Sequence, residues 1–415
     1  MLENIKNAIK SDILFIEWYF SRFVTASSGS EDGRGGVLIV PSDGRNLIGA
    51  VGDDAMITAI TQMRRSYFSE GDIYIITERE QAASLAKEIG LQPIEIPTGA
   101  TFAFAVKKLL KKHNFSEIII LGADIMDGYY DPRYVEKILI TADLGAKLGA
   151  VVNVIGFSFG LNSIPRLRKF FNKCDRRIHF NVRDRISFDR FRKFTSASPR
   201  LVADSAFLLE PGEVDSETTE WIEQQRRDGR TVVGFNIHPM LFKASTPEQL
   251  STLVEKCAQA IKDASEVTNA AWLLLPHDYR GDIGDGTCLK PIHEALHSDP
   301  SLHVRYFDGV HRAGTLKAVA GKLDGVVTGR MHLAIAALGM GVPTLCVTYQ
   351  DKFEGLFQHF DLPQEFLLSP EIFQSGNSAL SVAVKTFIES LPTLRLSVES
   401  KREKVLELSA RNFEL

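Results

Sequence analysis

Hydrophobic and polar positions follow two repeating patterns along this chain. Short runs of apolar, largely β-branched residues alternate with longer stretches in which apolar residues recur every three or four positions, the spacings of buried strands and amphipathic helices. In the first half the apolar runs are residues 37–40, 72–77, 93–96, 117–121, 150–156 and 177–182. Wholly apolar strands separated by helices predict a parallel sheet that is covered on both faces. We therefore predict a doubly wound α/β domain over residues 37–209.

The alternation stops at an acidic, turn-rich segment, residues 210–221 (EPGEVDSETTEW), and then resumes with a long helical pattern over residues 248–266. The later apolar runs are residues 231–237, 271–276, 302–307, 324–329 and 343–348. They predict a second Rossmann-like domain over residues 210–377, followed by a helical tail over residues 378–415. Two such domains that face each other form a cleft between their strand ends, where a ligand usually binds.

The first residues form a separate element, residues 1–36. Apolar side chains recur at helical spacing over residues 2–24, which predicts an amphipathic helix, and a polar linker follows at residues 27–36. Such a helix packs on its own domain or on a sister subunit, or it lies on a membrane surface. No basic polar face stands out in residues 2–24, so packing is the favoured interpretation.

Composition narrows the classes of partner and compartment. The 415 residues are 44% hydrophobic and 24% charged with a net charge of −4, as in an ordinary globular protein, which argues against a nucleic-acid partner. The four cysteines are far apart and lack the spacing of a zinc site or a disulfide framework: Cys174, Cys257, Cys288 and Cys346. We expect a cytoplasmic protein without a required metal. Contact with the inner face of the membrane through residues 2–24 stays open, as does a homo-oligomer.

One segment concentrates cationic groups. An apolar strand ends at Gly329, and a helical pattern follows directly, so Arg330 and His332 lie in the first turn of a helix. Free backbone N–H groups and the positive end of the dipole make a helix start attractive to phosphate or carboxylate. Consecutive strand ends lie on one edge of an α/β sheet, so Lys352, after the next strand, is expected near His332.

The same segment resembles a family signature. Residues 328–343 (TGRMHLAIAALGMGVP) and 349–355 (YQDKFEG) look like the signature of the polysaccharide pyruvyl transferase family. Lesser matches in the same order are residues 48–56, 121–128, 180–187, 202–209 and 275–282. The resemblance spans about residues 37–362. It implies a GT-B-like fold and the transfer of pyruvate from phosphoenolpyruvate to a sugar as a ketal, in exopolysaccharide or cell-surface polysaccharide biosynthesis.

The resemblance also implies roles for single residues. Arg183 and Arg330, with Gly329, would bind the donor, His332 would be the essential histidine, and Lys352 would supply a further cation. His332, Arg183 and Lys352 are thus the predicted catalytic group, with His332 as general acid or base. The alternative for Arg183 is an ion pair with Asp184 or Asp204. Phosphoenolpyruvate is the donor substrate, and no cofactor is implied.

The acceptor, a sugar, oligosaccharide or lipid-linked saccharide, is harder to place. Each candidate for its site has a structural alternative: a helix N-cap for Asp53 or its neighbour Asp54, a turn for Asp124, Asp127, Tyr129 and Tyr130, and a loop anchor for His277, which is also the rival proton carrier.

Two other functions of the protein stay open. One is a GT-B glycosyltransferase that uses a nucleotide sugar, with Glu354 on the ribose, and the other is a catalytically silent sugar-binding subunit of a polysaccharide assembly complex.

Overall fold

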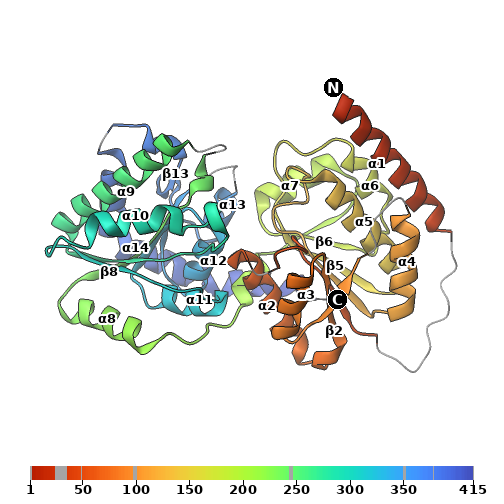
Figure 1. Cartoon of the computed structure of the whole chain (residues 1–415), viewed down its shortest axis with the longest axis horizontal. Helices are drawn as coiled ribbons and strands as arrows, with labels where there is room; N and C mark the ends of the chain where they lie inside the picture. The colour runs from red at the N-terminus through yellow and green to blue at the C-terminus, as the bar shows by residue number, and fades with distance from the viewer. Residues whose placement is uncertain are drawn as a thin grey trace. The chain divides into compact units, whose positions relative to one another are not determined.

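The computed structural model describes residues 2–23, 35–47, 49–96, 101–242, 246–348, 352–376 and 378–414. The chain forms two compact units (Figure 1). The first unit comprises Met1–Leu47, Met56–Ser205 and Leu408–Leu415, and the second comprises Ile48–Ala55 and Ala206–Glu407. Most of the predicted linker, residues 27–36, lies outside the described residues.

The first unit is built on a parallel sheet with seven strands in its described part, in the order β3-β2-β1-β4-β5-β6-β7. The strands are β1 Val37–Val40, β2 Ile73–Thr77, β3 Gln92–Glu95, β4 Glu117–Leu121, β5 Val151–Phe157, β6 His179–Val182 and β7 Pro199–Leu201. The α-helices are α1 Leu2–Ser21, α2 Val51–Arg65, α3 Glu80–Glu88, α4 Phe102–His113, α5 Pro132–Lys147, α6 Leu167–Lys173 and α7 Arg185–Phe194. Strands β1 and β4 are buried throughout because helices cover both faces of the sheet.

The second unit repeats this architecture with a parallel sheet of six strands in its described part, in the order β10-β9-β8-β11-β12-β13. The strands are β8 Thr231–Asn236, β9 Ala270–Leu274, β10 His303–Tyr306, β11 Gly325–Thr328, β12 Thr344–Val347 and β13 Leu367–Leu368. The helices are α8 Ser216–Arg227, α9 Pro247–Thr268, α10 Gly286–Leu296, α11 Ala313–Gly321, α12 Met331–Gly339, α13 Glu354–His359 and α14 Ala379–Ala410. The prediction of two doubly wound, Rossmann-like sheets is confirmed.

The structure differs from the predicted boundaries in three places. Two short edge strands, β7 and β13, have no long apolar run to predict them. Residues 48–55, which the alternation places in the first domain, belong to the second unit, although Ile48 itself is not described. The tail is one long helix, α14, and its last residues return to the first unit, where Asn412 accepts a hydrogen bond from the Gly156 amide at 2.9 Å.

Helix α1 packs on its own unit. The Trp18 ring is fully buried and stacks on Phe170 of α6, and its Nε1 donates to the buried carboxylate of Asp143 at 2.9 Å. The Ser11 hydroxyl donates to Glu136 of α5 at 2.7 Å. The predicted amphipathic helix is confirmed, and so is the packing of one of its faces. Within the described part of the chain, no helix is both long and apolar enough to cross a membrane.

Candidate functional site

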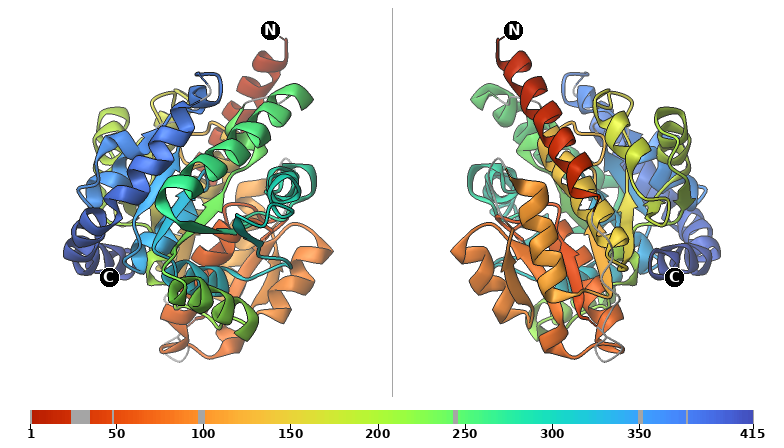
Figure 2. Two further views of the ribbon diagram at one scale, coloured as in Figure 1. Left: turned by 90° about the vertical axis from the view of Figure 1, so that its left-hand side faces the viewer. Right: turned by 90° about the vertical axis from the view of Figure 1, so that its right-hand side faces the viewer.

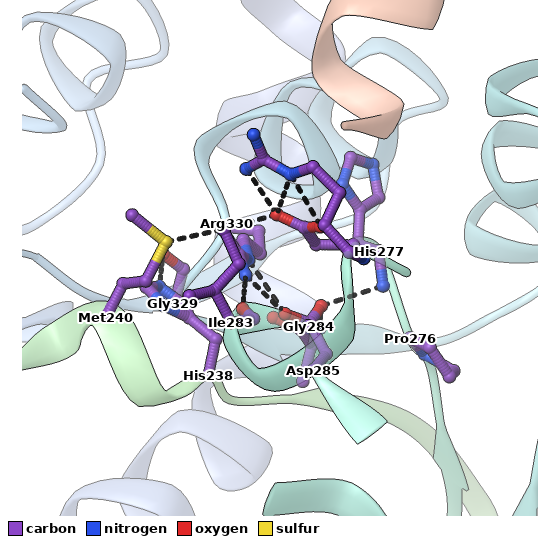
Figure 3. Close-up of polar contacts among 12 residues, drawn as sticks. His238, Met240, Pro276, His277, Ile283, Gly284, Asp285, Gly329 and Arg330 are labelled. Atoms are coloured by element: carbon purple, nitrogen blue, oxygen red, sulfur yellow. Dashed lines mark hydrogen bonds and ion pairs between the residues drawn. The ribbon is translucent and has the colours of Figure 1, made fainter. Parts of the chain in front are cut away.

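The cationic segment found in the sequence lies at the carboxyl edge of the second sheet. Strand β8 stands between β9 and β11, so the strand order reverses between β8 and β11. In open α/β sheets, ligands bind at the carboxyl edge beside such a reversal. Polar side chains lie at or just after three strand ends there: Asn236 and His238 at β8, His277 and Asp278 after β9, and Arg330 after β11. Figure 3 shows His238, His277 and Arg330 around Asp285.

A buried carboxylate, Asp285, joins these strand ends. It is inaccessible to solvent and accepts from Arg330 Nε at 2.9 Å and Nη2 at 2.6 Å (Figure 3). It also accepts from Asn236 Nδ2 at 2.7 Å and from the His277 amide at 2.8 Å. Burial raises the pKa of the Asp285 carboxyl, and the Arg330 charge opposes that rise. Asp285 therefore fixes the Asn236 side chain of β8, the backbone that follows β9 and the Arg330 side chain after β11 relative to one another.

The charge of Arg330 is largely offset. Besides Asp285, its guanidinium meets Asp278 at 3.2 Å, and Arg280 shares Asp278 at 2.7 Å. Only 12% of the Arg330 side chain is exposed. Two arginines thus face two buried carboxylates, and the cluster of these four residues carries no net charge. Arg330 is held in place at the helix start, but it adds little net attraction for an anion.

His332 lies one residue into α12, beside other imidazoles. Burial lowers the pKa of His277 well below its usual range, and the nearby charges of His332 and Arg330 lower it further. His238 is also buried, and burial with the Arg330 charge lowers its pKa in the same direction. His277 and His238 are therefore neutral near pH 7. His277 is 5% exposed and its backbone is bonded to Asp285, so the loop-anchor alternative describes it best.

The start of α2 and the residue before it contact this site directly. A Cβ added to Gly52 would lie 2.3 Å from His332 Nδ1, so the Gly52 backbone packs against the imidazole ring. Ala50 forms an isolated bridge to Asp278. A piece of chain far away in the sequence therefore forms one wall around His332.

Asp53 and Asp54 are not N-cap residues of α2. The helix begins at Val51, so both lie within its first turn. Asp54 is buried and caps another helix: its carboxylate accepts from the Ala313 amide at the start of α11 at 2.8 Å and from Arg312 Nε at 2.9 Å. Asp54 is thus a capping residue, as one alternative from the sequence proposed, but the helix that it caps is α11 and not α2. Asp53 is half-buried, and its contact with the saccharide acceptor stays a prediction.

Lys352 follows β12, and the residues just before it, 349–351, lie outside the described part of the chain. Thr328 of β11 pairs in parallel with Cys346 of β12, so the two strands end at the same edge of the sheet. This register places the ends of both strands as expected, and the approach of Lys352 to His332 stays a prediction. The Lys352 side chain is half-buried.

Arg183 has a structural partner, as one alternative from the sequence proposed. Its Nη1 donates to Asp204 at 2.8 Å and its Nε donates to the Ser158 hydroxyl at 2.7 Å. Both charged side chains are almost fully buried, 3% and 2% exposed. A ligand would have to break this pair to reach the guanidinium, which is costly for a buried carboxylate. The ion-pair alternative therefore describes Arg183 in this structure, and its donor-binding role stays a prediction.

The acceptor candidates after β4 form a bonded turn. Asp127 accepts from the Tyr129 amide at 2.9 Å and from the Gly160 amide at 3.1 Å, so its carboxylate is used by the backbone. The Tyr130 hydroxyl donates to Asp124 at 3.1 Å. Tyr129 and Tyr130 are 43% and 48% exposed and meet edge to face. The turn alternative describes Asp127, while the two rings keep a surface on which a sugar can stack.

A cavity of about 260 Å³ lies elsewhere at the carboxyl edge of the first sheet. The ends of β1 and β2 and the first turns of α5 enclose it, beside the strand-order reversal between β1 and β4. Its polar lining residues are Arg45, Glu78, Asp131, Arg133, Tyr134, Lys137 and Thr141. Sequence reasoning missed this cavity, and only the strand-end positions of Val40 and Ile76 signalled it. The described residues hold no cluster of His, Cys, Asp or Glu that could hold a metal ion.

Sequence reasoning also missed the members that hold the second-unit site together. The sequence patterns do not assign Asp285, Asn236 or Gly52 to the site. Asn236 follows directly from an apolar run, so its strand-end position was a usable signal. The contact of Gly52 with His332 had no signal at all, because it depends on two segments meeting in space.

Comparisons with known proteins concern the family and the fold. The family model described as polysaccharide pyruvyl transferase matches residues 51–351, a span that begins in α2 and stops one residue before Lys352. No curated protein sequence matches the chain significantly.

Among solved structures, a UDP-N-acetylglucosamine 2-epimerase is similar, with a TM-score of 0.55, 10% identity, and coverage of 92% of this chain and 94% of that one. Anabaena Alr3699/HepE in complex with UDP-glucose gives a TM-score of 0.50 and 12% identity, covering 91% of this chain and 98% of that one. At such low identity these likenesses establish the fold alone.

Proposed function

This chain belongs to the polysaccharide pyruvyl transferase family, and from that membership we propose that it transfers pyruvate from phosphoenolpyruvate to a sugar as a ketal, with release of phosphate. The observation that carries the proposal is the position of His332 and Arg330. They lie at the start of α12, at the strand-order reversal of the second sheet, inside the residues that the family model matches.

The donor needs positive charge that the arginine cluster does not provide. Phosphoenolpyruvate carries a phosphate and a carboxylate, whereas Arg330 is already balanced by Asp285 and Asp278. We assign the donor to the backbone N–H groups at the start of α12, to the His332 imidazole and to Lys352. Arg330 and Gly329 act as positioning residues that fix the helix start.

His332 is the proposed proton carrier. Ketal formation adds a proton to the methylene carbon, attaches one sugar hydroxyl to the neighbouring carbon, expels phosphate and closes through a second hydroxyl. The methylene carbon gains one proton, and both hydroxyls lose theirs, one of them to the departing phosphate. An imidazole that exchanges protons near neutral pH suits these steps. Gly52 packs against His332 Nδ1, so the backbone restricts the orientation of the ring.

We assign the acceptor to the cavity in the first unit. Its lining combines the hydroxyl of Tyr134 with the charged groups of Arg133 and Lys137 over an apolar floor of Val40 and Ile76. Sugar hydroxyls are recognised by convergent polar groups of this kind. The lining also contains Arg45 and the carboxylates of Glu78 and Asp131, so its cations outnumber its carboxylates by one, and this excess favours an acidic or phosphate-linked saccharide. The first-unit side chains after β4, Tyr129 and Tyr130, supply a second surface for a longer acceptor.

A nucleotide sugar is the competing donor, because the fold is also that of proteins solved with UDP-glucose. Thermal unfolding with phosphoenolpyruvate, UDP-glucose or no ligand separates the two, since only a ligand that binds the native state raises Tm. We expect phosphoenolpyruvate to stabilise the protein and UDP-glucose to leave Tm unchanged. Stabilisation by UDP-glucose alone would favour the glycosyltransferase.

Turnover is then tested with His332→Ala. The variant should still bind phosphoenolpyruvate through the start of α12 and Lys352, although more weakly. At saturating phosphoenolpyruvate it should release phosphate about a hundredfold more slowly with a saccharide acceptor, the usual scale for loss of a general acid or base. His311→Ala is the matched control, since His311 is a histidine of the same unit that stacks on Phe307. Normal phosphate release by His332→Ala would exclude this role. Phosphoenolpyruvate binding without turnover by the unsubstituted protein, over a panel of acceptors, would favour the silent sugar-binding subunit.

A further inference from the structure

Helix α1 has a second face that its own unit leaves uncovered. Its buried face carries Leu14 and Trp18. On the other side, five large apolar residues are more than half exposed: Ile9 (53%), Ile13 (54%), Ile16 (55%), Phe20 (62%) and Phe23 (71%). Steps of three and four residues place them on one side of the helix, and we name them the apolar stripe. Isolated exposed apolar residues are ordinary, but a continuous row of this length marks an interaction surface.

The stripe runs between two basic helices. On one side, the Phe104 amide of α4 donates to Glu17 at 3.2 Å, and Lys107 donates to the Ser21 carbonyl. On the other side, Lys169 of α6 pairs with Asp12 at 2.5 Å, and the Lys173 ammonium lies 5.0 Å from the centre of the Tyr19 ring. Helix α1 therefore lies over α5 with α4 and α6 as its neighbours; Figure 2, right, shows α1 (red) on the outside of this helical layer.

Both neighbours carry positive charge and no acidic residue. Helix α4 (FAFAVKKLLKKH) exposes Lys108, Lys111 and Lys112, and α6 (LRKFFNK) exposes Arg168 and Lys173. On α4, Phe104, Lys108 and Lys111 follow one another at helical spacing, so an exposed ring (49%) and two ammonium groups form one ridge beside the stripe. The basic face that residues 2–24 lack is supplied by the helices packed next to them.

We propose that the apolar stripe and its basic flanks dock this protein on the surface of a bilayer that contains anionic lipid. Apolar side chains of an interfacial helix enter the boundary between head groups and acyl chains, while flanking lysines meet anionic head groups. A second copy fits less well. In a two-fold contact the same patch meets itself, so the lysines of α4 and α6 would face other lysines and repel them. The surface concerns where the protein works and does not depend on the reaction proposed above.

Sedimentation of the full chain with vesicles tests the proposal. The protein should sediment with vesicles of equimolar phosphatidylcholine and phosphatidylglycerol, bind phosphatidylcholine vesicles at least about tenfold more weakly, and lose affinity as salt is added. Absence of binding to the mixed vesicles overturns the proposal whatever the variants do.

Two variants, each with a matched control, locate the surface. Ile13→Ser with Ile16→Ser and Phe20→Ser removes the centre of the stripe, while Val267→Ser with Leu396→Ser removes apolar residues that are 58% and 69% exposed in the second unit. Lys108→Glu with Lys111→Glu reverses the charge of the α4 flank. Lys290→Glu with Lys404→Glu, the control, reverses the charge of two exposed lysines in the second unit.

The stripe and flank variants should each weaken vesicle binding at least about tenfold, and the controls should match the unsubstituted protein. Equal loss in the controls would contradict a local surface. A concentration-dependent dimer that the stripe variant dissociates, without vesicle binding, would make a second copy the occupant and overturn the proposal.

Discussion

A single hydrogen atom at Gly52 leaves room for the His332 ring. The position is helical, so alanine is compatible with the backbone, yet its Cβ would come within 2.3 Å of Nδ1. The ring must then rotate or shift, and small displacements of a reacting group are costly in rate.

Gly52→Ala should therefore lower kcat/KM for phosphate release about tenfold or more, with a much smaller effect on Tm. Gly71→Ala is the matched control, because a Cβ there meets no atom within 4 Å. Steady-state kinetics and thermal unfolding of both variants check this prediction. Unchanged kinetics in Gly52→Ala would show that His332 is not held by this contact.

Two arginines that looked alike in the sequence have different surroundings. Arg183 is closed off by Asp204, and Arg330 is shared by Asp285 and Asp278. A motif predicts where an arginine lies along the chain, but its net charge depends on the carboxylates that fold beside it. In both cases those carboxylates come from other elements.

The neutral imidazoles of His238 and His277 predict a pH dependence of stability. Their pKa values are lowered in the folded protein, whereas in the unfolded chain they lie near 6.5. The unfolded chain therefore binds more protons below that pH, and the free energy of unfolding falls as the pH drops. At pH 5.5 the loss is about 1.4 kcal/mol for each histidine that stays neutral when folded.

Thermal unfolding between pH 7.5 and 5.5 measures this dependence. His238→Gln should remove one histidine's contribution to the dependence of Tm on pH. Glutamine is chosen because it can still donate to the Gly329 carbonyl that His238 Nε2 contacts at 2.9 Å. His297→Gln, at an exposed position, is the control and should keep the full slope. An identical slope in His238→Gln would mean that His238 is charged in the folded protein.

At the scale of elements, the first turn of α2 is tied to the start of α11. Asp54 accepts from the Ala313 amide and pairs with Arg312, so one carboxylate caps a helix and fixes a loop. The ion pair is partly exposed on the arginine side, which limits its contribution.

Asp54→Ala should lower the free energy of unfolding by about 2–3 kcal/mol. The loss combines the missing helix cap with the Ala313 amide and the Arg312 guanidinium, which both lose their acceptor. Asp53→Ala, one residue away in the same turn, should cost less than about 1 kcal/mol. Urea unfolding monitored by circular dichroism compares the two. Equal losses would indicate a general effect of charge in the first turn of α2 and not a specific cap.

At the scale of the whole molecule, the proposal divides the ligands between the two units. Phosphoenolpyruvate alone should slow amide exchange at residues 329–334 and in residues 49–55, where Gly52 contacts His332. A saccharide acceptor should slow exchange at residues 131–138 around the cavity of the first unit. Hydrogen–deuterium exchange with each ligand separately measures both effects. Protection by phosphoenolpyruvate confined to the first unit would move the donor away from His332.

The sequence by itself determined the two sheets and the strand edge at which His332 and Arg330 lie. Apolar runs report burial directly, and the carboxyl ends of parallel strands follow from their order, so His332 and Arg330 could be placed without coordinates. Helix α1 followed from its periodicity, although its basic flanks did not.

Only the tertiary structure decided which charged groups are already paired and which segments surround them. Asp204 closes off Arg183, Asp285 holds Arg330, and Gly52 packs against His332. Each of these contacts joins residues far apart in the sequence, and no local pattern encodes a distance between two segments. Periodicity reports which face of an element is buried, and the fold alone reports what that face meets.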